Sequence, residues 1–94
     1  MEKTFTATGN ALVSAPFGDW IGVSMVGNAE DFTWAIEFSI DGSTWKPYSD
    51  TTGEKEFTGS DVRWVKAGAK FSRVVVTGMG TATSIKAVAR NSGK

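Results

Sequence analysis

The segment Phe32–Tyr48, FTWAIEFSIDGSTWKPY, decides the fold class of this chain. Its first part alternates apolar and polar side chains with a period of two, which is typical of a strand with one buried and one wet face. The apolar positions are Phe32, Trp34, Ile36, Phe38 and Ile40. Asp41-Gly42 then breaks the strand, because Asp tolerates turn geometry and Gly adopts positive φ without steric cost. Thr44-Trp45 restarts an extended segment, which Pro47 limits to an edge or a strand end.

The rest of the chain repeats this pattern in short segments separated by turn residues. We expect further strands over residues 3–8, 11–14, 19–27, 54–58, 62–66, 70–77 and 83–90. The β-branched run Val74-Val75-Val76 has the strongest strand propensity. No segment shows a helical period with a cap. About 7–9 short strands, spaced by roughly ten residues, predict an all-β fold: a single small antiparallel β-sandwich, jelly-roll or immunoglobulin-like.

A chain of 94 residues has room for one hydrophobic core, so we expect a single domain over residues 1–94. Residues 1–8 are expected to form an N-terminal strand or arm, and residues 91–94 a frayed tail. A domain of this size buries only about 60–65% of its unfolded surface. Its stability is therefore modest unless an oligomer adds an interface.

The composition excludes several kinds of chemistry. The chain has no cysteine and no histidine, so it lacks disulfides and the pairs of nucleophile and histidine base that hydrolases use. We therefore expect no enzyme activity, no cofactor and no metal site. A calcium site at Asp41 and Asp50 is supported only by the spacing of these two residues around the hairpin. No apolar run approaches the ~20 residues that span a membrane. The N-terminus lacks the apolar core of a secretion signal, so we expect synthesis in the cytoplasm.

Net charge is zero, but its distribution is uneven. Residues 1–61 hold all ten acids and three lysines, a net charge of −7; residues 62–94 hold seven bases and no acid, a net charge of +7. In one interpretation the two halves interleave and neutralise each other across strands. In the other, the molecule has an acidic and a basic face, which suit head-to-tail packing of identical copies. Nucleic acid is not an expected partner, because the chain as a whole is not basic and arginine is scarce.

The four tryptophans point to different environments. Trp34 shares the phase of the apolar set in its strand and is expected in the core, and Trp45 is expected to fold onto the same core. Trp20 lies out of phase with the apolar set of its own strand, so it is either buried between sheets or on an outer surface. Trp64 lies in a short charged strand and is the tryptophan most expected to be exposed. Aromatic side chains on a flat surface can stack on a sugar or anchor a protein contact. The candidate interface or ligand contacts are Trp64, Trp20, Tyr48, Arg63 and Lys66.

Two segments carry a resemblance to a known family. Phe38–Trp45 reads FSIDGSTW, and Val65–Gly78 reads VKAGAKFSRVVVTG. Together they resemble the small β-sandwich structural proteins of tailed bacteriophages. Members of that family carry an Asp-Gly turn followed by Thr-Trp, and later an Ala-Gly-x-x-Phe/Tyr-x-Arg strand that ends in a Gly-rich tip. The resemblance covers residues 17–90, and the turn here has one glycine where the family often has two.

The resemblance implies a virion component, with a head decoration or cement protein as the main expectation. Its partners would be the major capsid protein or other virion proteins, and the chain would form a homo-oligomer, with a trimer favoured. A tail, neck or fibre-base component is the alternative within this class. Related turns also occur in unrelated carbohydrate-binding sandwiches, so a glycan-binding module that uses exposed aromatic side chains is the alternative from another class.

Overall fold

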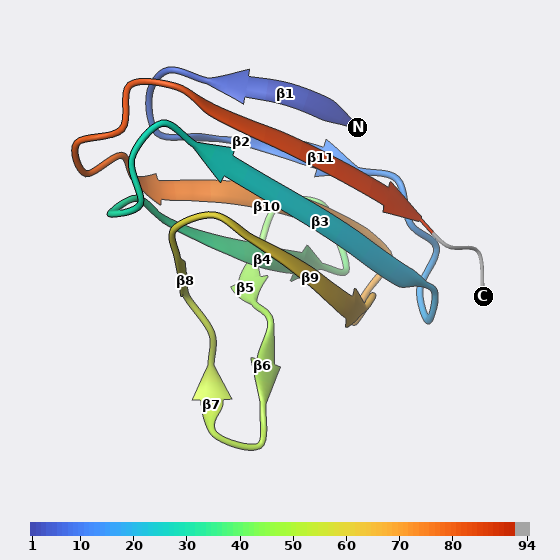
Figure 1. The fold of residues 1–94 in the computed structure, drawn as a ribbon. Helices are drawn as coiled ribbons and strands as arrows, with labels where there is room; N and C mark the ends of the chain where they lie inside the picture. Colours follow the sequence, from blue (N-terminus) through green and yellow to red (C-terminus); the bar gives the residue numbers. More distant parts are fainter. Residues whose placement is uncertain (92–94) are drawn as a thin grey trace.

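The computed structural model describes residues 1–91 as two antiparallel sheets packed face to face (Figure 1). Sheet A has the strand order β1 (Glu2–Phe5), β11 (Ile85–Asn91), β3 (Trp20–Gly27), β9 (Asp61–Lys66). Sheet B has the order β2 (Gly9–Val13), β10 (Phe71–Gly78), β4 (Thr33–Ser39), β5 (Lys46–Pro47), and β8 (Phe57–Thr58) also pairs with β4. A separate hairpin consists of β6 (Ser49–Asp50) and β7 (Gly53–Glu54). The predicted all-β sandwich is confirmed, with no helix in the described residues.

The core lies between the two sheets and follows the period of two. Four long strands, two from each sheet, turn every second side chain inward. The fully buried apolar positions on these strands are Ile21, Val23, Met25, Trp34, Ile36, Val74, Val76, Ile85, Ala87 and Ala89. The inward side chains of both sheets together form one core.

Trp34 connects sheet B with the segment that leads into sheet A. Its side chain is fully buried, and its indole N–H donates a 3.0 Å hydrogen bond to the carbonyl of Gly59. Its ring packs at 4.7 Å, centroid to centroid, against Phe57 of β8. Gly59 has a φ of +78°, and a side chain there would come within 2.8 Å of the Glu30 carbonyl oxygen. The turn from β8 into β9 is thus fixed by a buried indole on one side and by a required glycine on the other.

The outer face of β4 differs from the expectation. The sequence predicts that Ala35 and Ser39 are wet and that Ile40 is buried, but Ala35 and Ser39 are buried and Ile40 is 83% exposed. The strand ends at Ser39, so Ile40 belongs to the following loop. Ser39 is covered because that loop turns back, and the Ser39 hydroxyl accepts a 2.8 Å hydrogen bond from the Gly42 N–H.

The prediction that Trp45 joins the core is also wrong. Trp45 lies on the outer face of sheet B, where the guanidinium of Arg73 stacks 4.2 Å from the centre of its ring. Arg73 in turn forms a 2.7 Å ion pair with Glu37, its cross-strand partner on β4. Both side chains of this pair are largely covered, which makes the contact stronger than an ordinary surface pair. The loop after β4 is therefore anchored to the outside of the sandwich and not to its core.

Asp41 builds the turn of this loop. Its Oδ1 accepts hydrogen bonds from the backbone N–H groups of Thr44 and Ser43, both at 2.8 Å, and from the Ser39 hydroxyl at 3.0 Å. These bonds favour the ionised carboxylate, with the Thr44 N–H contributing most, and they lower the pKa of Asp41 from 3.8 to about 2. Gly42 supplies the positive φ of 81° that the turn needs.

The two charged halves of the sequence interleave. The basic strands β10 and β11 each lie inside a sheet, between strands from the acidic half. Arg73–Glu37 joins the halves in sheet B, and Lys86–Glu2 at 2.9 Å joins them in sheet A. Part of the sequence asymmetry is therefore neutralised by pairs within the sandwich.

The chain ends fit the expectation in part. The N-terminal segment forms strand β1 at the edge of sheet A, and the Met1 ammonium donates a 2.8 Å hydrogen bond to the Ala89 carbonyl. Of the predicted frayed tail, Asn91 is the last residue of β11, and residues 92–94 lie outside the described residues. The strand expected over residues 54–58 is divided between β7 and β8.

Replacing Asp41 by Asn should destabilise the domain in a pH-dependent way. Asn keeps an acceptor oxygen for the three donors but carries no charge. Because the folded-state pKa is lowered from 3.8 to about 2, the carboxylate contributes stability that is present above pH 3.8 and is lost as pH falls toward 2. Urea unfolding should give a lower free energy for D41N at pH 7, with the difference closing between pH 4 and 2. A difference independent of pH over this range would contradict the assignment.

Candidate interaction face on sheet A

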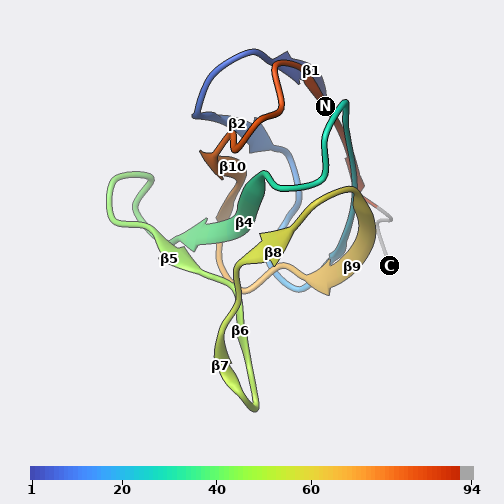
Figure 2. The same cartoon turned by 60° about the vertical axis from the view of Figure 1, so that its left-hand side comes forward.

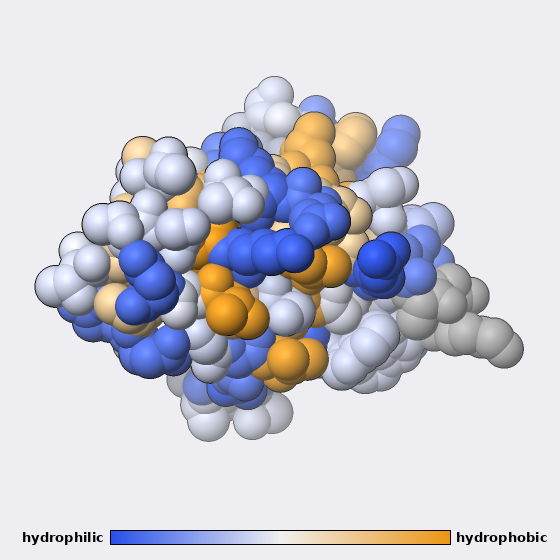
Figure 3. All heavy atoms as spheres, turned by 45° about the horizontal axis from the view of Figure 1, so that its top comes forward, coloured by the Kyte–Doolittle hydropathy of each residue, from blue (hydrophilic) through white to orange (hydrophobic). Residues whose placement is uncertain are grey.

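The outer face of sheet A carries four exposed large apolar side chains, from β3 and β9. Their exposed fractions are Trp20 41%, Val26 58%, Val62 63% and Trp64 58%. They alternate along the strands with core residues, so they point away from the sandwich. Seen from the side of sheet A, apolar side chains gather over the middle of the molecule, divided by hydrophilic ones (Figure 3). We call this surface the Trp face.

Trp64 lies flat on sheet A because its neighbour in the sheet has no side chain. Gly22 of β3 is the register partner of Trp64 on β9. A Cβ atom on Gly22 would lie only 2.7 Å from Cη2 of the indole and 2.8 Å from two further ring atoms. One face of the indole therefore rests on the backbone of β3, which leaves a planar aromatic surface open on the other side.

Two cations flank the tryptophans. Lys66 is the register partner of Trp20, and its Nζ lies 6.0 Å from the centre of the Trp20 ring. Arg90 of β11 lies across Gly22 from Trp64 in the sheet register. Within residues 1–91, neither Lys66 nor Arg90 has a carboxylate oxygen at ion-pair distance, although Arg90 adds a weaker attraction to Glu2. This end of the Trp face therefore combines flat apolar surface with positive charge.

The structure brings together three of the five predicted contact residues and separates the other two. Trp20, Trp64 and Lys66 share the Trp face. Arg63 lies on the opposite side of β9, where its guanidinium stacks 4.7 Å from the centre of the Phe57 ring and its Nε–H donates to Asp61. Tyr48 is half-buried between β5 and β6, and its N–H donates a 2.7 Å hydrogen bond to the Ile36 carbonyl.

The five predicted contact residues leave out the aliphatic members of the Trp face, Val26 and Val62, and its basic member, Arg90. Val62 shares the phase of Trp64 along β9, and Val26 shares the phase of Trp20 along β3, so alternation alone could have grouped each pair. Arg90 could not be found in this way. Its place beside Gly22 follows from the pairing of β11 with β3, and these strands are almost sixty residues apart in the sequence.

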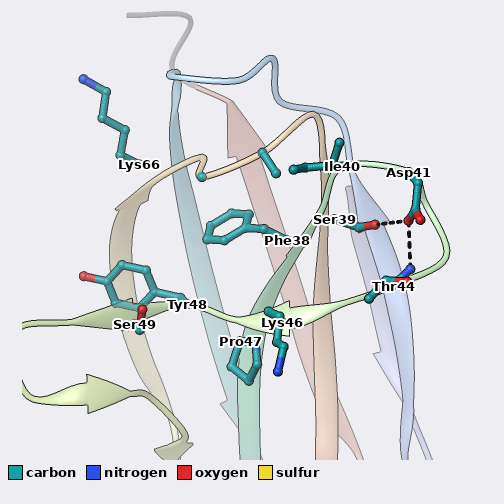
Figure 4. A pocket seen from close by; sticks show the side chains of 12 residues that line it. Phe38, Ser39, Ile40, Asp41, Thr44, Lys46, Pro47, Tyr48, Ser49 and Lys66 are labelled. Atoms are coloured by element: carbon teal, nitrogen blue, oxygen red, sulfur yellow. Dashed lines mark hydrogen bonds between the residues drawn. The ribbon is translucent and has the colours of Figure 1, made fainter.

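A cavity of about 710 Å³ opens at the edge of the sandwich where β4 and β5 face the connection from β9 to β10. Phe38 points into it and is flanked by Tyr48, and Lys46 and Lys66 direct their amines away from it (Figure 4). Asp41, the acid on its wall, is fully engaged by the turn. The cavity offers an apolar floor and no acid–base pair.

Two adjacent carboxylates in the loop between β3 and β4 have structural partners. Glu30 accepts hydrogen bonds from the Ser60 hydroxyl at 2.6 Å and the Ser60 N–H at 2.7 Å, which lower its pKa. Asp31 accepts hydrogen bonds from the N–H of Thr81, at 2.9 Å, and from its hydroxyl, and these lower its pKa. The two acids therefore tie the β3–β4 loop to two different neighbouring loops.

Comparisons of this chain with family models, with curated proteins and with solved structures find no match. Among the described residues, no group of three or more acidic side chains is placed to hold a metal ion. The described part of the chain also has no helix with the length and hydropathy needed to cross a membrane.

Replacing Gly22 by Ala should displace the Trp64 indole from β3. The new methyl group would occupy the space of the ring, and the exposed side chain can swing away, so we expect a loss of stability of only about 1 kcal/mol. Fluorine NMR of 5-fluorotryptophan-labelled protein should show one resonance shifted toward the solvent-exposed value, the one that Trp64→Phe removes. The control S24A, on the outer face of the same strand, should leave that resonance in place. An unshifted resonance in G22A would contradict the described packing.

Proposed function

We propose that this protein is a non-enzymatic structural component of a tailed-bacteriophage virion, a capsid decoration protein that binds the assembled head. The observation that carries the proposal is the Trp face, which exposes Trp20, Trp64, Val26 and Val62 on a domain that already has a complete core. Exposed aromatic side chains that lie flat on a rigid sheet lose little conformational freedom on binding and are common anchors of protein interfaces. We assign this face to a protein–protein contact in the assembled head.

The two resembling segments contact each other, which supports reading them as one motif. Arg73, from the Ala-Gly-x-x-Phe-x-Arg strand, stacks on Trp45 of the Asp-Gly-Ser-Thr-Trp turn. Phe71 of the same strand pairs with Ser39, and a Cβ atom added at Gly42 would lie 3.7 Å from its ring. The motif thus has an architectural role on sheet B, which leaves the Trp face on the opposite sheet available for binding.

A decoration protein acts through mass action. If it binds the assembled shell and not free capsid subunits, each occupied site stabilises the shell by about 2.7 kcal/mol at a free concentration of 100 Kd. A trimeric protein would multiply this effect, because three linked copies can bind sites around one symmetry axis. A tail, neck or fibre-base component could use the same face. The part of the particle to which the protein binds distinguishes these positions from a position on the head.

Heads assembled without the protein should melt at a lower temperature than heads to which purified protein is added back. The double variant W20A/W64A should fail to restore the higher melting temperature, because it loses both aromatic anchors of the Trp face. The control F17A removes an aromatic side chain that is 72% exposed but lies outside this face, and it should restore protection fully. Equal melting of bare and decorated heads would exclude the decoration role, and binding to tails alone would favour the alternative position.

A glycan-binding module is the second candidate, because the outward face of the Trp64 indole is planar and open. Sugar rings stack on such surfaces through their C–H groups. If this function is correct, titration with a polysaccharide panel should quench tryptophan fluorescence, and Trp64→Ala should abolish the quench. Phe17→Ala should leave it unchanged. A flat response across neutral and acidic polysaccharides would remove this candidate.

A further inference from the structure

A short hairpin with more acidic than basic residues projects from the sandwich. We call residues Ser49–Glu56, which include β6 and β7, the acidic arm. Figures 1 and 2 both show it extending away from the two sheets. It carries Asp50, Glu54 and Glu56 against one lysine, Lys55. All of its residues except Lys55 are exposed.

The acidic arm is held in shape by local polar contacts and not by a core. Asp50 Oδ1 accepts hydrogen bonds from the Thr52 N–H at 2.8 Å and from the Thr52 hydroxyl at 2.7 Å, and Lys55 Nζ lies 3.6 Å from the same oxygen. At its base, the Lys55 N–H donates to the Tyr48 carbonyl and Glu56 accepts from the Thr77 hydroxyl. A two-stranded hairpin is at best marginally stable alone. Its order therefore depends on these contacts, and they leave Glu54 outside every ion pair found in residues 1–91.

The Trp face has the complementary properties. Lys66 and Arg90 place positive charge beside Trp20 and Trp64 and lack a close carboxylate within residues 1–91. The acidic arm is negatively charged and has exposed threonines at its tip. It therefore complements the Trp face, which is flat and apolar with cations at its border. The base of the arm lines one pocket with Trp64 of its own chain, but β6, β7 and the turn between them project beyond the two sheets (Figure 2), so we place the match between copies.

We propose that the acidic arm of one copy docks on the Trp face of a second copy, with Glu54 paired to Lys66 and Arg90. Thr51 and Thr52 at the arm tip would then lie over the two indoles. The contact uses two different surfaces and is heterologous, so it closes into a ring when the rotation between copies permits and otherwise continues into a chain. This inference rests on the proposed assembly function, because it names the partner of the same face.

Charge reversal in separate copies tests the contact. Light scattering after size exclusion should show concentration-dependent self-association of the native chain that weakens as salt is raised to ~0.5 M. E54K alone and K66E alone should each associate about tenfold more weakly, because attraction becomes repulsion at every contact. An equimolar mixture of the two should associate again, since the reversed arm of E54K meets the reversed face of K66E, and the unchanged arm of K66E meets the unchanged face of E54K. K46E, the same charge change on sheet B, should behave as the native chain.

Three results would overturn the proposal: a native chain that stays monomeric at low salt, single variants that associate as the native chain does, or a mixture that stays dissociated. Circular dichroism of each variant shows that it is folded, so a loss of association is not unfolding. The outcome is separable from the decoration role. A dissociated E54K that still raises the melting temperature of heads keeps the decoration role, whereas native self-association without head protection keeps the arm contact and removes the decoration role.

Discussion

The buried indole of Trp34 is the contact on which both sheets depend. It is the largest fully buried side chain, it lies on a central strand of sheet B, and its N–H is bonded to the Gly59 carbonyl where the chain crosses toward sheet A. A buried indole N–H without an acceptor would cost about 1–3 kcal/mol, so the position of Gly59 is coupled to the position of the core. The positive φ of Gly59 then directs the chain into β9, the strand that carries Trp64. The Trp face is thus positioned by a contact in the interior.

The parts of the fold that alternation could predict are those in which a side chain's position is set by its own strand. The strands at residues 20–27, 71–78 and 85–91 lie within two residues of the expected bounds, and the burial of Trp34 follows from its phase. Trp45, Ile40 and Ser39 could not be placed in this way, because their burial depends on the direction in which the loop after β4 returns. That direction is set by the local bonds to Asp41 and by the Arg73–Trp45 stack, and the stack joins residues far apart in the sequence.

The same distinction applies to the candidate site. Exposure of Trp64 was expected from its charged strand and is confirmed, whereas its association with Trp20 and Arg90 needs the order β11-β3-β9. Period-two patterns say which residues share a face of one strand, but not which strands are neighbours. The interleaving of the acidic and basic halves is likewise a consequence of strand order. It neutralises Arg73 and Lys86 and leaves Lys66 and Arg90 without close carboxylates among the described residues.

The two outer faces of the sandwich differ in whether a tryptophan on the surface is covered by the rest of the chain. On sheet B, the loop after β4 brings Trp45 against Arg73, so the chain covers its own indole. On sheet A, Trp64 remains 58% exposed, and the strand beneath it contains Gly22. Glycine inside a strand weakens it, because it loses more conformational freedom on folding and contributes no side-chain packing. Gly22 therefore weakens β3, but the space left by its missing side chain lets the Trp64 indole lie flat with its outer surface free. Sheet A holds the Trp64 indole flat and exposed, with Lys66 and Arg90 nearby. These are the features of a binding surface and not of an incompletely buried core.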